Sequence, residues 1–342
     1  MQRMCDTAGV RLRAHGKMHK CSTLARRQIE FGAVGVCAQT IGEAEAFEAA
    51  EIPDILITAP VALNSAARVA ALAGRTRIAA VADDARLIEA LAAAARVANT
   101  TVGLVVDVDL GQHRSGCTPE EAPALARLAS KSGGLRYDGV QAYVGHLQHV
   151  DDVAARRAAT DAASAGLKAL VEALTAEGLK PAAVTGGGTG TYGYDLAGGV
   201  FTEIQAGSYA VMDAEYDDCG SPDGGAWPFQ PAMYVASTVV SARQPTHATI
   251  DAGLKALSTD GKLPKVIGRG DGSRFRFQGD EHGAVIPPAG GAMPALGEVV
   301  WLQPGHCDPT VNLYDAFLVW TGDGWERWPI DARRRTAEID AA

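Results

Sequence analysis

The chain has 342 residues, of which 47% are hydrophobic and 6% aromatic, and its formal net charge is −9 at pH 7. Because a typical domain has about 100–200 residues, we expect one large domain and a smaller one. The negative charge, together with the lack of a basic patch interleaved with aromatic residues, argues against nucleic acid as a partner.

The sequence also argues against a membrane partner or a secreted protein. No apolar run approaches the roughly 18 residues that a membrane-spanning helix needs, and the first residues lack the apolar core of a signal peptide. The six cysteines are scattered without a C-x-x-C pair, which in a chain of this length predicts reduced thiols. We therefore expect a soluble, cytoplasmic protein.

From residue 10 to about residue 213, short apolar runs alternate with alanine-rich helical stretches. The predicted strands are 10–14, 34–38, 54–58, 77–81, 102–108, 139–144, 182–185 and 202–205. The predicted helices are 22–31, 41–50, 62–73, 84–98, 119–130, 152–177 and a short one near 194–197. Eight strands separated by helices predict a parallel (β/α)8 barrel, which we expect at residues 1–213.

The pattern changes after residue 213. A turn-rich stretch at 217–225 is followed by β-like runs and by no long helical pattern. The predicted strands here are 234–242, 248–250, 274–277, 298–302 and 316–320, separated by glycine and proline clusters. We therefore predict an α/β fold in which the barrel is followed by an all-β domain over residues 214–335.

A lysine follows the first predicted strand. Residues two apart on a strand share a face, so we expect Arg13, His15 and Lys17 to project together. A lysine at the carboxyl end of a barrel strand can form a Schiff base with a carbonyl cofactor or substrate. The alternatives are a surface lysine in a loop and a histidine that is a hydrogen-bonded core residue rather than an acid or base.

An arginine lies in the loop after the strand at 102–108. Arg114 could direct its fork of N–H donors at a phenolate or a carboxylate. The alternative for this segment is a loop that caps the next helix.

A glycine-rich run covers residues 185–191 and includes Thr189. Backbone N–H groups of glycines can converge on an anion, and threonine hydroxyls add donors, so the run suits a phosphate. Gly207 and Ser208 follow the eighth predicted strand, and the loops after strands seven and eight are the usual phosphate site of such barrels. The spacing G-x-G-x-x-G in this region also permits a dinucleotide site, but that fingerprint normally follows the first strand of its domain.

The predicted β-domain contains a His-x-Asp sequence. In an extended segment His306 and Asp308 would face the same way, with Cys307 facing the other. An imidazole and a carboxylate suit a divalent metal ion with further positions open to water, although two ligands at this spacing also occur by chance.

Taken together, these segments resemble the D-threonine aldolases, relatives of alanine racemase that use pyridoxal 5'-phosphate (PLP). The most specific matching segments are 15–20, 35–37, 251–255 and 305–313. The resemblance implies that Lys17 carries PLP. It further implies that Arg114 approaches the phenolic oxygen, Gln205 the pyridine nitrogen and Tyr143 the cofactor face, that Thr189, Gly207 and Ser208 bind the phosphate, and that His306 and Asp308 hold an activating metal.

The implied reaction is the cleavage of a D-3-hydroxy amino acid to glycine and an aldehyde, with the metal acidifying the β-hydroxyl and a group such as His15 taking its proton. Related D-serine and 3-hydroxyaspartate dehydratases resemble one another in carrying His-x-Cys at the metal site. Asp308 is a hard ligand that favours Mn²⁺, Mg²⁺ or Co²⁺ over Zn²⁺, and therefore favours the aldolase. The dehydratase is the alternative; a PLP-dependent racemase and an NAD-dependent oxidoreductase are more distant ones.

Three further expectations come from the resemblance. The protein would be a homodimer. The family begins earlier, with a β-domain strand and a helix entering the barrel, so we expect this barrel to be N-terminally short. Because Gln205 is neutral, we expect it not to hold the pyridine nitrogen protonated as an aspartate would.

Overall fold

The computed structural model describes residues 1–333. Contacts divide the chain into two compact units: Met1–Gly207 together with the segment from Ala316 onward, and Ser208–Asp315. No helix among the described residues is both long enough and apolar enough to cross a membrane.

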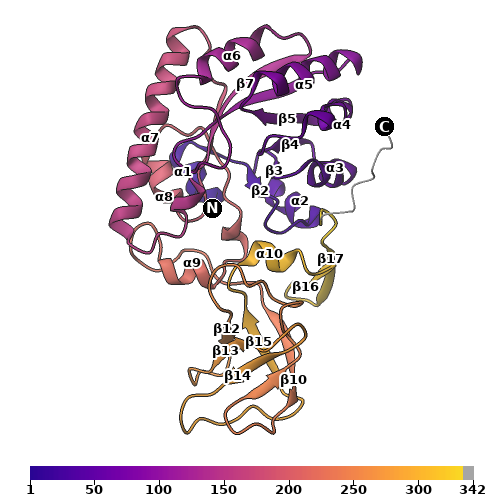
Figure 1. Cartoon of the computed structure of the whole chain (residues 1–342), viewed down its shortest axis with the longest axis vertical. Coiled ribbons are helices and arrows are strands. Elements are labelled where there is room, and N and C mark those ends of the chain that lie inside the picture. The colour runs from indigo at the N-terminus through magenta and orange to yellow at the C-terminus, as the bar shows by residue number, and fades with distance from the viewer. Residues whose placement is uncertain (334–342) are drawn as a thin grey trace. The chain divides into compact units, whose positions relative to one another are not determined.

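The first unit contains a parallel sheet that closes on itself (Figure 1). The sheet order is β1-β9-β8-β7-β6-β5-β4-β3-β2. Its strands are β1 (Arg11–Leu12), β2 (Ala14–His15), β3 (Val36–Ala38), β4 (Asp54–Ile57), β5 (Arg77–Ala82), β6 (Val102–Val108), β7 (Leu135–Ala142), β8 (Ala183–Gly186) and β9 (Glu203–Ile204). Only Arg13 separates β1, which pairs with β9, from β2, which pairs with β3. The two ends of the sheet are therefore halves of one strand, and the predicted (β/α)8 barrel is confirmed.

Helices surround these strands (Figure 1). They are α1 (Gln2–Ala8), α2 (Ser22–Glu30), α3 (Ile41–Ala49), α4 (Ala66–Leu72), α5 (Ala85–Val97), α6 (Ala122–Lys131), α7 (Val153–Ala176) and α8 (Tyr192–Gly198). Side-chain caps begin several of them: Asp152, for example, accepts hydrogen bonds from the first backbone N–H groups of α7 at 2.9 Å. The predicted start of α6 at residue 119 is wrong. A turn in which Thr118 and Glu121 bond each other's backbone N–H groups precedes it.

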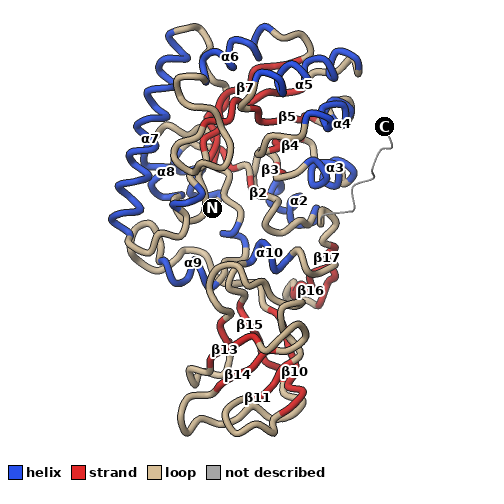
Figure 2. The backbone as a smooth tube through the Cα atoms, viewed as in Figure 1, coloured by secondary structure: helices blue, strands red, loops and turns tan. Residues whose placement is uncertain are grey.

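The second unit is a closed antiparallel barrel with the strand order β10-β11-β14-β13-β12-β15. Its strands are β10 (Val235–Ser241), β11 (Ala248–Ile250), β12 (Lys265–Ile267), β13 (Arg274–Phe277), β14 (Gly283–Ile286) and β15 (Val299–Gln303), and its helices are α9 (Ala214–Cys219) and α10 (Cys307–Val311). Figure 2 shows how much of the unit is loop. The predicted all-β character is confirmed, but β12 and β14 were not predicted because proline flanks each of these short runs. The core of the unit contains Val239, Ile250, Leu257, Phe275, Val285 and Leu302.

A hairpin of β16 (Ala316–Trp320) and β17 (Trp325–Pro329) belongs to the first unit. After it, the backbone N–H of Ala332 donates to the Lys20 carbonyl at 2.9 Å, and Asp331 accepts from the Ser22 N–H at the start of α2, also at 2.9 Å. The loop that contains Lys17 is therefore held by the C-terminal segment of the described chain.

Candidate functional site

Lys17 lies in the turn that follows β2, at the carboxyl end of the barrel, and is half-buried. Gly16 makes this turn possible, because a methyl group there would lie 2.5 Å from the Phe47 ring and 2.9 Å from Val36. The prediction that Lys17 shares a strand face with Arg13 and His15 is wrong, since the strand ends at His15. The turn nevertheless puts Lys17 at the barrel end where such folds carry their reactive groups.

His15 is buried at the end of β2. Its Nδ1 is 3.4 Å from the backbone N–H of Lys17, which can only donate, and its Nε2 is 3.0 Å from the hydroxyl of Thr58. If Nδ1 accepts, the ring proton of a neutral imidazole sits on Nε2 and donates to Thr58. Both ring nitrogens of His15 are thus already engaged with protein groups.

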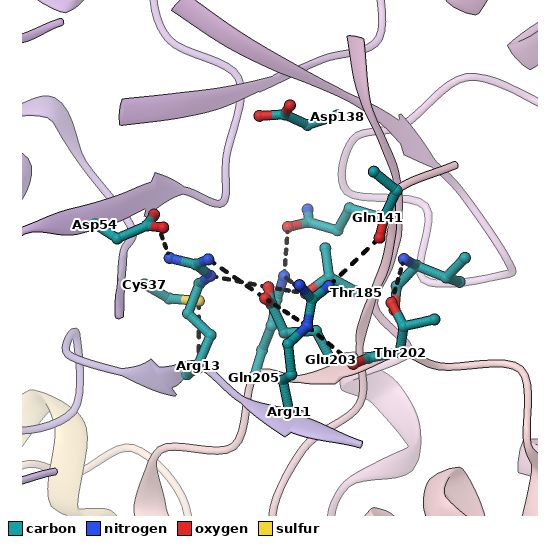
Figure 3. Close-up of polar contacts among 12 residues, drawn as sticks. Arg11, Arg13, Cys37, Asp54, Asp138, Gln141, Thr185, Thr202, Glu203 and Gln205 are labelled. Atoms are coloured by element: carbon teal, nitrogen blue, oxygen red, sulfur yellow. Dashed lines mark hydrogen bonds and ion pairs between the residues drawn. The ribbon is translucent and has the colours of Figure 1, made fainter. Parts of the chain in front are cut away.

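Polar side chains surround Gln205 in the barrel interior (Figure 3). Gln205, directly after β9, donates from Nε2 to Gln141 Oε1 and to the Thr185 hydroxyl, each at 3.0 Å. Gln141 in turn donates to the Thr58 carbonyl at 2.9 Å and to Asp107 Oδ1 at 2.8 Å. Burial raises the pKa of Asp107 above its usual value.

Arg114 and Tyr143, which follow β6 and β7, lie close together. The exposed guanidinium of Arg114 is 5.7 Å from the centroid of the Tyr143 ring, a distance at which a cation is attracted to a ring face. The loop before Arg114 is organised by Asp109, whose Oδ1 accepts three backbone N–H groups at 2.9–3.0 Å.

The glycine-rich segment after β8 packs tightly against Gln148. A methyl group on Gly190 would lie 1.8 Å from the Gln148 carbonyl oxygen, and the Gly190 N–H donates to Gln148 Oε1 at 2.9 Å. The Gly188 N–H and the Thr191 hydroxyl point to Asp195 Oδ2, at 3.4 Å and 2.6 Å. The N–H groups of Gly188 and Gly190 are therefore directed at protein acceptors.

Asp195 was not predicted as part of this site. Its carboxyl is fully buried, and burial raises its pKa to about 7, although hydrogen bonds from Thr191 and Gly188 act in the opposite direction. Because the pKa is near neutrality, the charge beneath this loop depends on pH in the physiological range.

Two other predicted phosphate ligands, Gly207 and Ser208, follow Gln205 along the chain. A methyl group on Gly207 would lie 3.0 Å from the His15 carbonyl oxygen, so a side chain there would press on the end of β2. Thr189 is almost fully buried. These residues follow β8 and β9, as the sequence predicts for a phosphate site.

His306 and Asp308 lie in the second unit. The prediction of an extended segment is wrong from Cys307 onward, because α10 begins there with an acidic residue and Pro309 in its first turn, both of which favour a helix start. His306 is the extended N-cap residue, and its Nε2 is 3.9 Å from Asp308 Oδ1. The helix start therefore still brings the imidazole and the carboxylate together.

The loop opposite α10 supplies a partner for His306. Asp260 Oδ2 lies 2.7 Å from His306 Nδ1. The loop comes so close that a methyl group on Gly305 would lie 1.7 Å from the Lys262 carbonyl oxygen. Among residues 1–333, no group of three or more His, Cys, Asp or Glu side chains is arranged to hold a metal ion.

The amino end of the barrel holds a buried ion pair that was also not predicted (Figure 3). Arg13 Nε donates to Glu203 Oε1 at 2.9 Å, and its Nη1 donates to Asp54 at 2.7 Å. A signal for it exists in the sequence, since Arg13 lies two residues before His15 and Glu203 two residues before Gln205. Because side chains two residues apart point to the same face of a strand, Arg13 is expected to point inward with His15, and Glu203 with Gln205.

Comparison with known proteins agrees with this architecture. Residues 1–215 match the family described as alanine racemase, N-terminal domain, and residues 232–320 match the putative serine dehydratase domain. The 3-hydroxy-D-aspartate aldolase of Paracoccus denitrificans (strain Pd 1222) is 40% identical over 337 residues, which make up 95% of this chain and 85% of that protein. The crystal structure of D-threonine aldolase from Filomicrobium marinum is 36% identical, with a TM-score of 0.92, and the match covers 97% of this chain and 90% of that one. The D-threo-3-hydroxyaspartate dehydratase of Delftia sp. (strain HT23) is 30% identical, over 96% of this chain and 92% of that protein.

Proposed function

The chain belongs to the alanine racemase-like family that includes D-threonine aldolase and 3-hydroxy-D-aspartate aldolase, and from this premise we propose that it is a lyase that cleaves D-3-hydroxy amino acids to glycine and an aldehyde. The observation that carries the proposal is the position of Lys17, half-buried in the turn after β2 at the carboxyl end of the barrel.

The family implies PLP as the cofactor, and the donor set fits it. Lys17 would hold it, with Arg114 toward the phenolic oxygen, Gln205 toward the ring nitrogen and Tyr143 toward the ring face. Thr189, Gly207 and Ser208 would bind the phosphate. When bound, PLP supplies an electron sink for the charge left on the α-carbon as the Cα–Cβ bond breaks.

We also propose that His306 and Asp308 hold Mn²⁺, Mg²⁺ or Co²⁺. Such an ion would lower the pKa of the substrate β-hydroxyl. Asp260 supports this assignment, since a carboxylate that accepts the Nδ1 proton of His306 leaves Nε2, on the Asp308 side, free of a proton. This carboxylate–histidine arrangement is common around protein-bound metals.

A proton must leave the β-hydroxyl during the cleavage. His15 is the proposed acceptor in the barrel, but its ring could take a proton only after releasing either the Thr58 hydroxyl or the Lys17 N–H. We therefore propose that substrate binding changes one of these two contacts, because a base must be within hydrogen-bond reach of the proton it removes.

The cofactor assignment is tested by a visible absorption spectrum of the reconstituted protein and by borohydride reduction followed by peptide mass spectrometry. We expect a visible band and a pyridoxyl adduct on Lys17. Lys20→Ala is the matched control, because Lys20 lies three residues on but is paired with Glu43 at 2.5 Å, so this variant should keep the adduct while Lys17→Ala loses it. A colourless protein without an adduct on Lys17 would overturn the proposal.

The activity is tested by measuring glycine and aldehyde release from D-threonine before and after chelation, with Mn²⁺ added back. His306→Ala should abolish the dependence on metal together with most of the activity. The alternative, suggested by the dehydratase relative, is β-elimination of D-serine or 3-hydroxyaspartate, which would release ammonia and a keto acid instead. The homodimer and the cytoplasmic location that the family resemblance implies are part of this proposal, and sedimentation analysis tests the former.

A further inference from the structure

The hydrogen bonds beneath the barrel mouth determine which atom of the Gln205 amide can meet a ligand. The determining group is the Thr58 carbonyl oxygen, which can only accept and lies 2.9 Å from Gln141 Nε2. The amide of Gln141 must therefore present its NH2 group to Thr58 and its oxygen to Gln205. This assignment holds whatever the protonation state of Asp107, the second acceptor of the Gln141 NH2 group.

The second neighbour of Gln205 gives the same orientation. The Thr185 hydroxyl donates to Glu203 Oε1 at 3.1 Å, and Glu203 acts only as an acceptor there because Arg13 Nε and Nη2 donate to its two oxygens at 2.9 Å and 3.3 Å. With its own hydrogen directed to Glu203, the Thr185 oxygen accepts from Gln205.

Both hydrogens of the Gln205 NH2 group are therefore used within the barrel, on Gln141 Oε1 and on Thr185 Oγ1. The reverse orientation would put the Gln205 oxygen against the oxygens of both neighbours and lose two hydrogen bonds. No side chain or backbone group of residues 1–333 donates to Gln205 Oε1, yet this atom is not among the fully enclosed polar atoms that lack a partner. The amide thus keeps one open position, and that position is an acceptor.

Resting on the proposed PLP site, we propose that Gln205 Oε1 accepts a hydrogen bond from the protonated pyridine nitrogen of the cofactor, so that this protein holds the ring as a pyridinium. An unprotonated ring nitrogen has only a lone pair and would face another acceptor. A hydrogen bond made only by the charged form favours that form, and it does so more strongly where water is scarce. This reverses the expectation from the sequence that a neutral residue leaves the nitrogen unprotonated.

In this arrangement Gln205 contacts the cofactor, whereas Gln141 and Thr185 are positioning residues that act through the Gln205 amide. The ion pair between Arg13 and Glu203 belongs to the same chain of contacts, because it directs the Thr185 hydroxyl hydrogen away from Gln205.

The test is the nitrogen NMR signal of the resting holoenzyme reconstituted with PLP labelled with ¹⁵N in the ring. We expect the signal at the position of a protonated pyridine through neutral and mildly alkaline pH. Gln205→Leu should move it to the unprotonated position, and Gln205→Glu should keep it protonated to higher pH. Thr185→Val should shift the signal part of the way toward the unprotonated position, whereas Thr185→Ser, which retains the hydroxyl, should leave it unchanged.

A wild-type signal at the unprotonated position would overturn the inference, as would a protonated signal that persists in Gln205→Leu. The wild-type measurement alone decides the matter if a variant does not fold. Failure of the proposed function gives a different result. In that case no labelled cofactor is retained and borohydride gives no adduct on Lys17, whereas an adduct with an unprotonated ring would overturn only this inference.

Discussion

Buried polar groups are partnered differently at the two ends of the parallel barrel. At the amino end, Arg13 is bound by Glu203 and Asp54, and Arg136 by Asp138 at 2.6 Å, so charges are compensated by opposite charges. At the carboxyl end, Gln205 donates to the Gln141 amide and the Thr185 hydroxyl, and the Asp107 carboxyl accepts from the Gln141 amide and the Ser115 hydroxyl. The amino end thus pairs buried charges with opposite charges, whereas the network around Gln205 consists mainly of neutral hydrogen-bonding groups.

The charged groups of the amino end and the neutral groups of the carboxyl end lie on successive inward-facing positions of the same strands. His15 follows Arg13 by two residues, and Gln205 follows Glu203 by two, so successive inward positions on the same strands are first charged and then neutral. If the amino end serves stability and the carboxyl end serves ligand binding, substitutions at the two ends should separate these properties.

The largest expected effect is at the amino end. Glu203→Gln keeps the shape of the side chain but leaves Arg13 buried with a weakened partner, and breaking a buried pair costs about 3–5 kcal/mol in the free energy of unfolding. Urea unfolding of the apoprotein measures it. The double variant Arg13→Met with Glu203→Leu should recover most of the loss, since both charges of the pair are removed and Asp54 keeps its ion pair with Arg77 at 3.0 Å. A double variant as unstable as the single one would contradict this account.

The next effect is at the carboxyl end and depends on pH. The pKa of Asp195 is about 7 in the folded protein because of burial, against about 3.9 in an unfolded chain. Between these values the native state holds a proton that the unfolded state has lost, so stability falls as pH rises from about 4 to about 7.

Asp195→Asn removes this contribution, which is on the order of 4 kcal/mol across that range. Unfolding of the apoprotein at a series of pH values should give a flatter curve for the variant than for the wild type. Identical slopes for the two proteins would show that the carboxyl is ionised throughout.

A smaller effect is expected from the space around the ion pair. A methyl group at Gly35 would lie 2.4 Å from the Asp54 carbonyl oxygen and 2.5 Å from Arg13 Nη1. Gly35→Ala should therefore lower the free energy of unfolding by about 1–3 kcal/mol, the usual cost of overpacking. Borohydride trapping at Lys17 should be unchanged, because the clash lies at the opposite end of the barrel from the cofactor site. A loss of trapping without a loss of stability would contradict the separation of the two ends.

The smallest effect is expected from a second glycine-to-alanine variant, which serves as the control for Gly35→Ala. Gly166 lies on the exposed side of α7, where an added methyl group meets nothing within 4 Å. Gly166→Ala should raise the free energy of unfolding by about 0.5–1 kcal/mol through helix propensity alone. Thermal unfolding of both variants in one buffer should show a lower melting temperature for Gly35→Ala and a higher one for Gly166→Ala than for the wild type.

Local pattern was sufficient to predict the barrel. The alternation of apolar runs and alanine-rich stretches indicated its strands, and the predicted position of Lys17 after the first of them is confirmed. Where local pattern failed, a competing local signal had been missed: the Asp-Pro after Cys307 starts a helix, and the Thr118–Glu121 turn delays α6.

The polar network could not be predicted in the same way, because its partners are far apart in the sequence. Gln205 and Gln141 are separated by 64 residues, and Arg13 and Glu203 by 190. Period-two alternation shows that such side chains point inward, but it does not show which of them meet. The orientation of the Gln205 amide, and with it the proposed protonation of the ring, follows only from the hydrogen bonds that Gln205 makes with Gln141 and Thr185.

The C-terminal ties to the Lys17 loop have a consequence for biosynthesis. Asp331 and Ala332 bond Ser22 and Lys20, so the surroundings of a lysine made among the first residues are completed by residues made more than three hundred positions later. During translation the Lys17 loop therefore cannot make these contacts until the ribosome has synthesised nearly all of the described chain.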